Sequence, residues 1–234
     1  MKNREELLNE LQKNLNIKFK DINYLKIALT HSSFANGKID VEFNERFEFL
    51  GDSILSICIS EYLFKKYKDK YEGELTRLRS LIVCEYSLYE IARIWNMGLY
   101  LNMSKGEELT GGRERVSILA DSVEALIAAV YLDAGFESAR EFVLVNFKST
   151  IKKAITNEIV LDYKTKLQEI LQENGEVNIE YKLLKYEGPP HRRKFYSQVE
   201  KNGENLGLGS GFSKKDSEQD AAQNALKELG NKNV

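Results

Sequence analysis

The stretch NERFEFLGDS, residues 44–53, decides how the first part of this chain folds. It places three carboxylates, Glu45, Glu48 and Asp52, among large apolar residues. Because an α-helix turns by about 100° per residue, these acids lie within an arc of about 60° on one helix face. Like charges at this spacing repel each other and do not stabilise a helix. This row of acids therefore has two interpretations. It is either a solvated helix start, where acids interact favourably with the helix dipole, or a site for a metal ion or a basic partner.

A second acidic pair lies in the segment SILADSVEALIAAVYLDA, residues 117–134. Asp121 and Glu124 are three residues apart and so share one helix face. The segment is apolar on nearly every side, which is typical of a buried helix, and no basic residue occurs between Val116 and Arg140. An acidic pair that happens to be exposed is the alternative. Because buried carboxylates need a compensating charge, we favour the interpretation that the two acidic helices share a divalent cation.

The ligand types favour a hard cation. Zinc sites use Cys and His, which are missing from both segments. Di-iron carboxylate bundles need Glu-x-x-His pairs, and neither of the two histidines, His31 and His191, follows a Glu by three residues. We expect His31 to be a structural hydrogen-bonding residue. An all-carboxylate set fits Mg²⁺ or Mn²⁺, and such sites typically act on phosphate esters.

Composition narrows the class of protein. Of the 234 residues, 42% are hydrophobic and 30% are charged, which suits a soluble globular chain. No run of about 18 apolar residues occurs, and the charged N-terminus lacks the apolar segment of a signal peptide. The two cysteines, Cys58 and Cys84, suit a reducing environment as small buried residues. We therefore expect a cytoplasmic protein without a membrane partner, whose net charge of −2 requires any nucleic-acid site to come from local clustering.

Hydrophobic periodicity predicts two domains. Residues 1–157 should form an all-α domain, 158–161 a linker and 162–231 a smaller α+β domain. The helical signals of the first domain lie near 4–13, after Asp21, at 75–95 and at 117–134, with a turn-rich segment at 31–40 and a loop at 98–114. The second domain has the order α-β-β-β-α, with strands expected near Ile179–Tyr186, Lys194–Lys201 and Asn205–Gly211.

Three features of the second domain indicate RNA binding. Gln168 and Gln172 lie one helical turn apart and can hydrogen-bond 2′-hydroxyl groups. A rigid Gly-Pro-Pro loop ending at His191 is followed by three basic residues. Lys214 and Lys215 stand at the start of the last helix, where backbone N–H groups favour phosphate. Each feature alone is common on solvated surfaces, but together they resemble the double-stranded RNA-binding domain.

The chain resembles bacterial ribonuclease III in three segments: NERFEFLGDS (44–53), YEGELTRLRS (71–80) and GEELTGGRERVSILADSVEALIAAVYLDAG (106–135). The resemblance implies an all-helical endonuclease domain that cuts double-stranded RNA as a homodimer. It implies that Glu48, Asp121 and Glu124 bind Mg²⁺, for which Mn²⁺ can substitute. Asp52 and Glu124 would be the central catalytic acids.

The same resemblance implies supporting roles. Glu45 and Glu72 would be accessory acids at the cleft, and Phe49 would insert into the partner subunit, although its own pattern suits core packing. The implied reaction is in-line hydrolysis of the RNA phosphodiester by a metal-activated water. It would leave 5′-phosphate and 3′-hydroxyl ends with short 3′ overhangs, and the implied substrates are ribosomal RNA precursors and other structured transcripts.

Two other functions remain as alternatives. One is a double-stranded RNA-binding regulator without catalysis, and the other is a helical metal-carboxylate redox protein. All six acids implied by the resemblance are present, which argues against the first. The missing Glu-x-x-His pairs and the RNA-binding features argue against the second.

Overall fold

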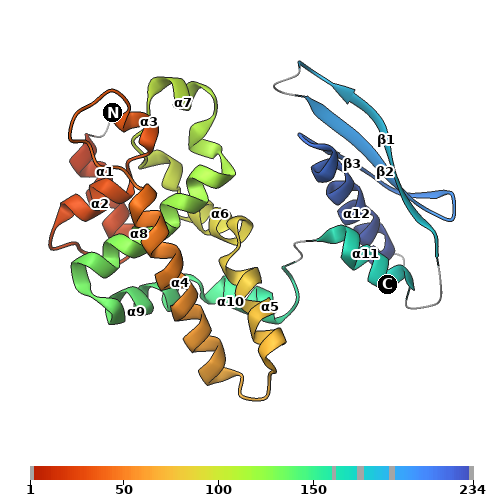
Figure 1. The fold of residues 1–234 in the computed structure, drawn as a ribbon, viewed down its shortest axis with the longest axis horizontal. Helices are drawn as coiled ribbons and strands as arrows, with labels where there is room; N and C mark the ends of the chain where they lie inside the picture. Colours follow the sequence, from red (N-terminus) through yellow and green to blue (C-terminus); the bar gives the residue numbers. More distant parts are fainter. Residues whose placement is uncertain (1–2, 160–161, 173–176, 190–192, 232–234) are drawn as a thin grey trace. The chain divides into compact units, whose positions relative to one another are not determined.

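The computed structural model describes residues 3–159, 162–172, 177–189 and 193–231 (Figure 1). The chain separates into two compact units, Met1–Ile159 and Val160–Val234. The first unit consists of helices, and the second combines two helices with an antiparallel sheet. The predicted fold class, an all-α domain followed by an α-β-β-β-α domain, is confirmed.

The helices of the first unit vary widely in length. In chain order they are α1 (Arg4–Asn14), α2 (Ile22–Ala28), α3 (Ser32–Ala35), α4 (Glu45–Lys66), α5 (Glu72–Val83), α6 (Glu85–Ile94), α7 (Lys105–Leu109), α8 (Val116–Ala134), α9 (Phe136–Asn146) and α10 (Lys148–Ile155). Two 3₁₀ turns, η1 (Met97–Leu99) and η2 (Gly112–Glu114), flank α7. The segment expected to be a loop at 98–114 thus contains the short helix α7 and the 3₁₀ turn η2.

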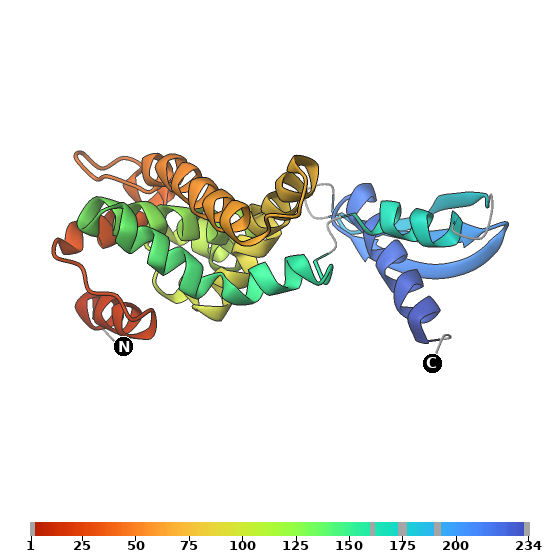
Figure 2. The ribbon, with the colours of Figure 1, turned by 90° about the horizontal axis from the view of Figure 1, so that it is seen from below.

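Helix α8 is the centre of the first unit. Most of its residues between Ile118 and Val130 are buried, as the apolar pattern predicts. Helices α2, α4, α6 and α9 pack around it. In Figure 2, α4 (orange) lies alongside α8 (green). Removal of this apolar surface from water is the main force that holds the surrounding helices on α8.

One predicted helix is divided in two. The pattern at 75–95 predicts a single helix, but α5 and α6 are separated at Cys84, which is extended with φ −69° and ψ 155°. The hydroxyl of Ser87 donates a hydrogen bond of 2.7 Å to the carbonyl of Leu81 across the break. The break lets α5 pack against α4 while α6 packs against α8. Apolar periodicity continues through it and therefore does not reveal it.

The second unit is a small three-stranded sheet with two helices. In chain order its elements are α11 (Tyr163–Gln172), β1 (Ile179–Glu187), β2 (Lys194–Lys201), β3 (Glu204–Gly211) and α12 (Lys214–Asn231). The strand order is β1-β2-β3, and Val199 of β2 lies in a core with the apolar sides of α11 and α12. A Cβ atom on Gly209 would lie 2.0 Å from the backbone nitrogen of Ala221. Helix α12 therefore lies directly on the backbone of β3.

None of the helices in the described ranges is long and apolar enough to cross a membrane.

Candidate functional site

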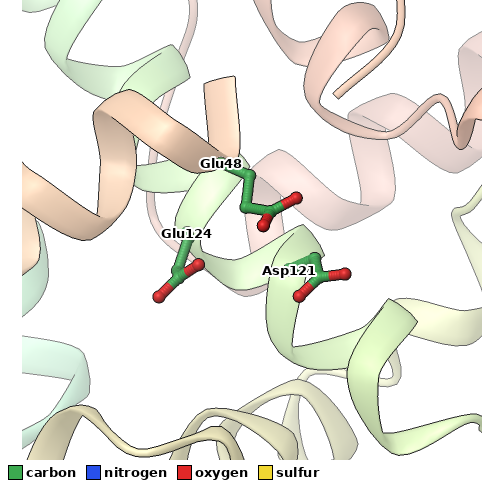
Figure 3. Close-up of side chains that lie close together, drawn as sticks. All are labelled: Glu48, Asp121 and Glu124. Atoms are coloured by element: carbon green, nitrogen blue, oxygen red, sulfur yellow. The ribbon is translucent and has the colours of Figure 1, made fainter. Parts of the chain in front are cut away.

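Three carboxylates converge where α4 meets α8. Glu48 comes from the first turn of α4, whereas Asp121 and Glu124 come from α8 (Figure 3). Each offers one carboxylate oxygen, and these three oxygens lie within 4.8 Å of one another. All three side chains are partly buried. The fold thus brings together the three acids that the sequence predicts to bind a metal, which are called the acidic cluster below.

The convergence depends on Gly51 of α4. A Cβ atom at this position would lie 1.9 Å from the backbone carbonyl oxygen of Glu124. No side chain fits there, so glycine lets the backbones of the two helices come into contact. Glu48 and Asp52 flank Gly51 and are therefore held beside α8. The acidic pattern does not predict this role, and the available signal is a glycine inside a strongly apolar helical pattern.

Burial and mutual repulsion perturb the acidic cluster. The pKa of Glu124 is raised to about 8, first by burial and then by the charge of Asp52, to which the other two clustered acids add. Burial also raises the pKa of Glu48, and the charge of Asp121 raises it further. Both shifts have the direction expected for carboxylates that share a partly buried site without a counter-charge.

Two residues that the sequence does not predict as site residues, Glu85 and His31, change the pKa of Asp121. Burial raises the pKa of Asp121, the charge of Glu85 raises it further, and His31 opposes both effects. Glu85 is the first residue of α6, directly after the break at Cys84, so periodicity does not place it near the cluster. His31 caps α3, and its Nδ1 lies 2.8 Å from the hydroxyl oxygen of Ser33. These contacts are those of the structural hydrogen-bonding residue that the sequence predicts.

The remaining predicted acids lie at the edge of the cluster or away from it. Asp52 is exposed, yet its charge acts on two of the three clustered acids. Glu45 is the first residue of α4, is exposed and acts on Glu48. Glu72 begins α5 and accepts a hydrogen bond of 2.8 Å from the hydroxyl of Thr76. Among the residues that the structure describes, Glu72 has no hydrogen bond or ion pair with the cluster.

The acidic cluster fits a hard divalent cation. In the described part of the chain, none of its carboxylates forms a salt bridge with a basic residue. Uncompensated charges in a partly buried site favour a bound cation. Mg²⁺ holds oxygen ligands at about 2.1 Å, which places neighbouring ligands roughly 3–4 Å apart. The three carboxylate oxygens lie within 4.8 Å of one another, so small side-chain movements would bring them to this spacing.

Phe49 is exposed and does not belong to the core. Its sequence pattern suits core packing, but 78% of the residue is exposed. Ile57 and Phe64, which are 55% and 73% exposed, lie within an arc of about 80° from it on α4. The three residues are called the α4 stripe below. These three exposed apolar side chains share one face of α4, so they are a candidate surface for contact with another protein.

The second unit gathers most of the predicted RNA contacts around one concavity. Gln168 and Gln172 of α11 and Lys215 of α12 line it. The side chain of Lys214, which precedes Lys215 in the first turn of α12, is 62% exposed. His191, the remaining predicted RNA contact, lies outside the described residues. The surface thus offers amide groups from one helix and a cation from the other.

Two known families match separate parts of the chain. Residues 21–151 match a family described as ribonuclease-III-like. Residues 163–229 match the double-stranded RNA binding motif. The first match covers the acidic cluster, and the second covers Gln168, Gln172 and Lys215.

Individual relatives match along nearly the whole chain. Ribonuclease 3 of Clostridium kluyveri is 63% identical over 94% of this chain and 90% of its own length. Ribonuclease 3 of Clostridium perfringens is 60% identical over 94% of this chain and 93% of its own length. Among solved structures, the nuclease domain of ribonuclease III from Campylobacter jejuni is similar with a TM-score of 0.58 and 43% identity, covering 61% of this chain and 97% of that one. With both units matched in order, the chain belongs to the ribonuclease III family of double-stranded RNA endonucleases.

Proposed function

We propose that the acidic cluster binds Mg²⁺ and hydrolyses phosphodiester bonds of double-stranded RNA. The observation that carries this proposal is the convergence of three carboxylate oxygens within 4.8 Å. Membership of the ribonuclease III family supports the reaction. Carboxylate oxygens suit Mg²⁺, for which Mn²⁺ can substitute. When bound, such a cation supplies an activated water and stabilises the leaving oxygen.

Each acid has a task in this proposal. Glu48, Asp121 and Glu124 hold the cation, and Asp52 joins Glu124 as a central catalytic acid. Asp52 is exposed beside the cluster and so can accept a proton from the attacking water. In-line attack of this water on the phosphorus would break the P–O3′ bond. The phosphate would stay on the 5′ end, and the leaving 3′-oxygen would take up a proton from solvent to become a 3′-hydroxyl.

Glu45 and Glu72 are proposed as accessory acids. Both are exposed first residues of their helices, α4 and α5, and so are open to substrate or to bound water. Neither belongs to the 4.8 Å cluster. Their removal should therefore weaken catalysis less than the removal of a clustered acid.

We also propose that the chain acts as a homodimer through the α4 stripe. The Campylobacter jejuni structure concerns flexibility in a region involved in dimer formation of that nuclease domain. A phenylalanine as exposed as Phe49 is unfavourable in water, and insertion into a partner subunit would remove it from water. Two acidic clusters would then act on one duplex, one for each strand. By resemblance to ribonuclease III, we expect the two cuts to be staggered and to leave short 3′ overhangs.

The second unit is proposed to hold the duplex. We assign residues 162–231 to the RNA-binding domain, 158–161 to the linker and 1–157 to the nuclease domain. Gln168 and Gln172 would contact 2′-hydroxyl groups, and Lys214 and Lys215 would contact phosphates. His191, which follows β1 in the sequence, would extend the contact. The match of residues 163–229 to the double-stranded RNA binding motif supports this assignment.

As substrates we propose ribosomal RNA precursors and other structured transcripts, including messenger RNA. Duplex shape and 2′-hydroxyl groups are read with little dependence on sequence, so many structured RNAs can serve. Processing of such transcripts would occur in the cytoplasm. End-mapping of the RNAs that accumulate when the protein is depleted would identify them.

The central test is cleavage of a duplex RNA with Mg²⁺, with Mn²⁺ and with a chelator. We expect both strands to be cut only when metal is present. Glu124→Gln should bind the duplex and leave it intact, whereas Glu45→Gln should keep part of the activity. Binding of the unchanged protein without cleavage under every metal condition would instead indicate an RNA-binding regulator.

A further inference from the structure

Gln219 of α12 holds the first turn of α11 through three hydrogen bonds. Its side-chain oxygen accepts the backbone N–H of Tyr163 at 2.7 Å and that of Lys164 at 3.4 Å. Its amide group donates to Oδ1 of Asp162 at 2.9 Å. That oxygen also accepts the N–H of Thr165 at 3.1 Å. Asp162 and Gln219 together thus satisfy the first N–H groups of α11, which have no partner within their own helix.

An ion pair next to Gln219 reinforces this contact. The carboxylate of Glu218 lies 2.6 Å from the Lys164 ammonium, which also lies 4.3 Å from the ring centre of Tyr181. The hydrogen bond from Gln219 is the main cause that lowers the pKa of Asp162 to about 2, so Asp162 is charged near neutral pH. Both interactions join α12 to the start of α11.

Helix periodicity connects this contact to the RNA-binding surface. Gln219 and Lys215 lie four residues apart on one face of α12. Lys164, Gln168 and Gln172 follow one another at the same spacing on one face of α11. All five residues line the same concavity. The hydrogen bonds of Gln219 to the start of α11 therefore fix the separation between Lys215 and the two glutamines, Gln168 and Gln172.

We propose that Gln219 is a positioning residue for duplex RNA. It holds α11 so that Gln168 and Gln172 stand at the distance from Lys215 that simultaneous contact with one duplex requires. This inference rests on the RNA contacts proposed above for these three residues. Gln219 acts through them, because its side-chain oxygen accepts two backbone N–H groups and its amide donates to Asp162, which ties the side chain to the start of α11.

The test compares Gln219→Ala with Gln223→Ala in the full chain. Gln223 is a matched control because it also joins α12 to α11, donating to the Tyr163 hydroxyl at 2.8 Å, but it does not hold the backbone of the first turn. Binding to a short RNA duplex is measured with chelator, so that no cleavage occurs, at several salt concentrations. Gln219→Ala should raise Kd about tenfold, whereas Gln223→Ala should raise it less than about twofold.

The salt dependence distinguishes positioning from unfolding. The slope of log Kd against log salt should stay unchanged in Gln219→Ala, because Lys214 and Lys215 still contact phosphates. A smaller slope, together with a lower melting temperature of the second unit, would show general disruption and would overturn the positioning role.

A double-mutant cycle completes the test. In a chain that already carries Gln168→Ala and Gln172→Ala, Gln219→Ala should add little, since it acts through those two side chains. Full additivity, or an unchanged Kd for Gln219→Ala alone, would overturn only the positioning role. If Gln168→Ala with Gln172→Ala leaves Kd unchanged, the proposed RNA contacts are themselves wrong and the inference falls with them.

Discussion

Gly51 of α4 packs directly against the backbone carbonyl of Glu124 in α8, where a Cβ atom would lie 1.9 Å from the oxygen. Alanine usually stabilises a helix by about 1 kcal/mol relative to glycine. Here the added methyl group must push α4 away from α8, so we expect Gly51→Ala to destabilise the protein by about 2–3 kcal/mol. It should also weaken Mg²⁺ binding, because Glu48 moves away from Glu124. Urea unfolding and metal titration measure the two effects.

Gly73→Ala is the matched control for this substitution. Gly73 also lies in a helix, α5, but a Cβ atom there would meet nothing within 4 Å. This variant should be as stable as the unchanged protein or slightly more stable. Equal stability of the two alanine variants would contradict the close contact between α4 and α8.

The raised pKa of Glu124 predicts how the metal-free protein responds to pH. The pKa rises from its ordinary value of 4.5 to about 8 in the folded chain, so folding favours the protonated carboxyl. The contribution of the Glu124 carboxyl to the free energy of unfolding is fully present below pH 4.5 and is lost as the pH rises through about 8. In chelator, the melting temperature of the first unit should therefore fall across this range. Glu124→Gln should reduce the fall, because an amide carries no charge.

Magnesium should reverse this loss of stability in the unchanged chain. A cation that binds only the folded state raises the melting temperature, and the effect should be largest where Glu124 is deprotonated. Glu124→Gln should show little increase with Mg²⁺, whereas Glu45→Gln, which alters an exposed acid outside the cluster, should behave almost as the unchanged chain. The same melting response to Mg²⁺ in Glu124→Gln would exclude Glu124 as a ligand.

Much of the acidic cluster follows from local spacing. Periodicity shows which acids share a helix face, and the apolar surroundings of Asp121 and Glu124 show that their charges need compensation. The distance between α4 and α8 does not follow, because it depends on a contact of Gly51 with a residue far along the chain. Glu85 is missed for a related reason, since the break before it interrupts the helix but not the apolar pattern.

Phe49 shows a different limit of sequence patterns. An apolar residue at helical spacing has the same pattern in a core as in a subunit interface, because both surfaces exclude water. Only the exposure of 78% separates the two interpretations. The order of elements in the second unit, by contrast, depends on local alternation and turn residues, and it is predicted from them.

The exposure of Phe49 allows a test of the proposed homodimer. Phe49→Ala removes a side chain that contributes little to the fold of one chain, so the monomer should unfold at nearly the same urea concentration. The dimer dissociation constant should rise by at least about tenfold if the ring is buried in a partner. Sedimentation at several protein concentrations measures it. Leu109→Ala, at a residue of α7 that is 88% exposed, is the control and should leave dimerisation unchanged.

Each subunit of the proposed homodimer would carry its own acidic cluster. Glu48, Asp121 and Glu124 of one chain meet without any contribution from a second chain. If each cluster serves one strand, a mixed dimer of one unchanged and one Glu124→Gln subunit should bind duplex RNA normally and cut only one strand.

The product of the mixed dimer should be a nicked duplex. It would appear as one shortened strand on a denaturing gel and as an intact species on a native gel. Co-expression with two different affinity tags isolates the mixed dimer from both homodimers, and the Glu124→Gln homodimer serves as the uncut control. Double-strand breaks at the unchanged rate would mean that one cluster serves both strands. Each cluster draws its three close carboxylates from a single chain, so the unchanged subunit should remain active. Complete loss of cleavage would therefore mean that the two clusters depend on each other.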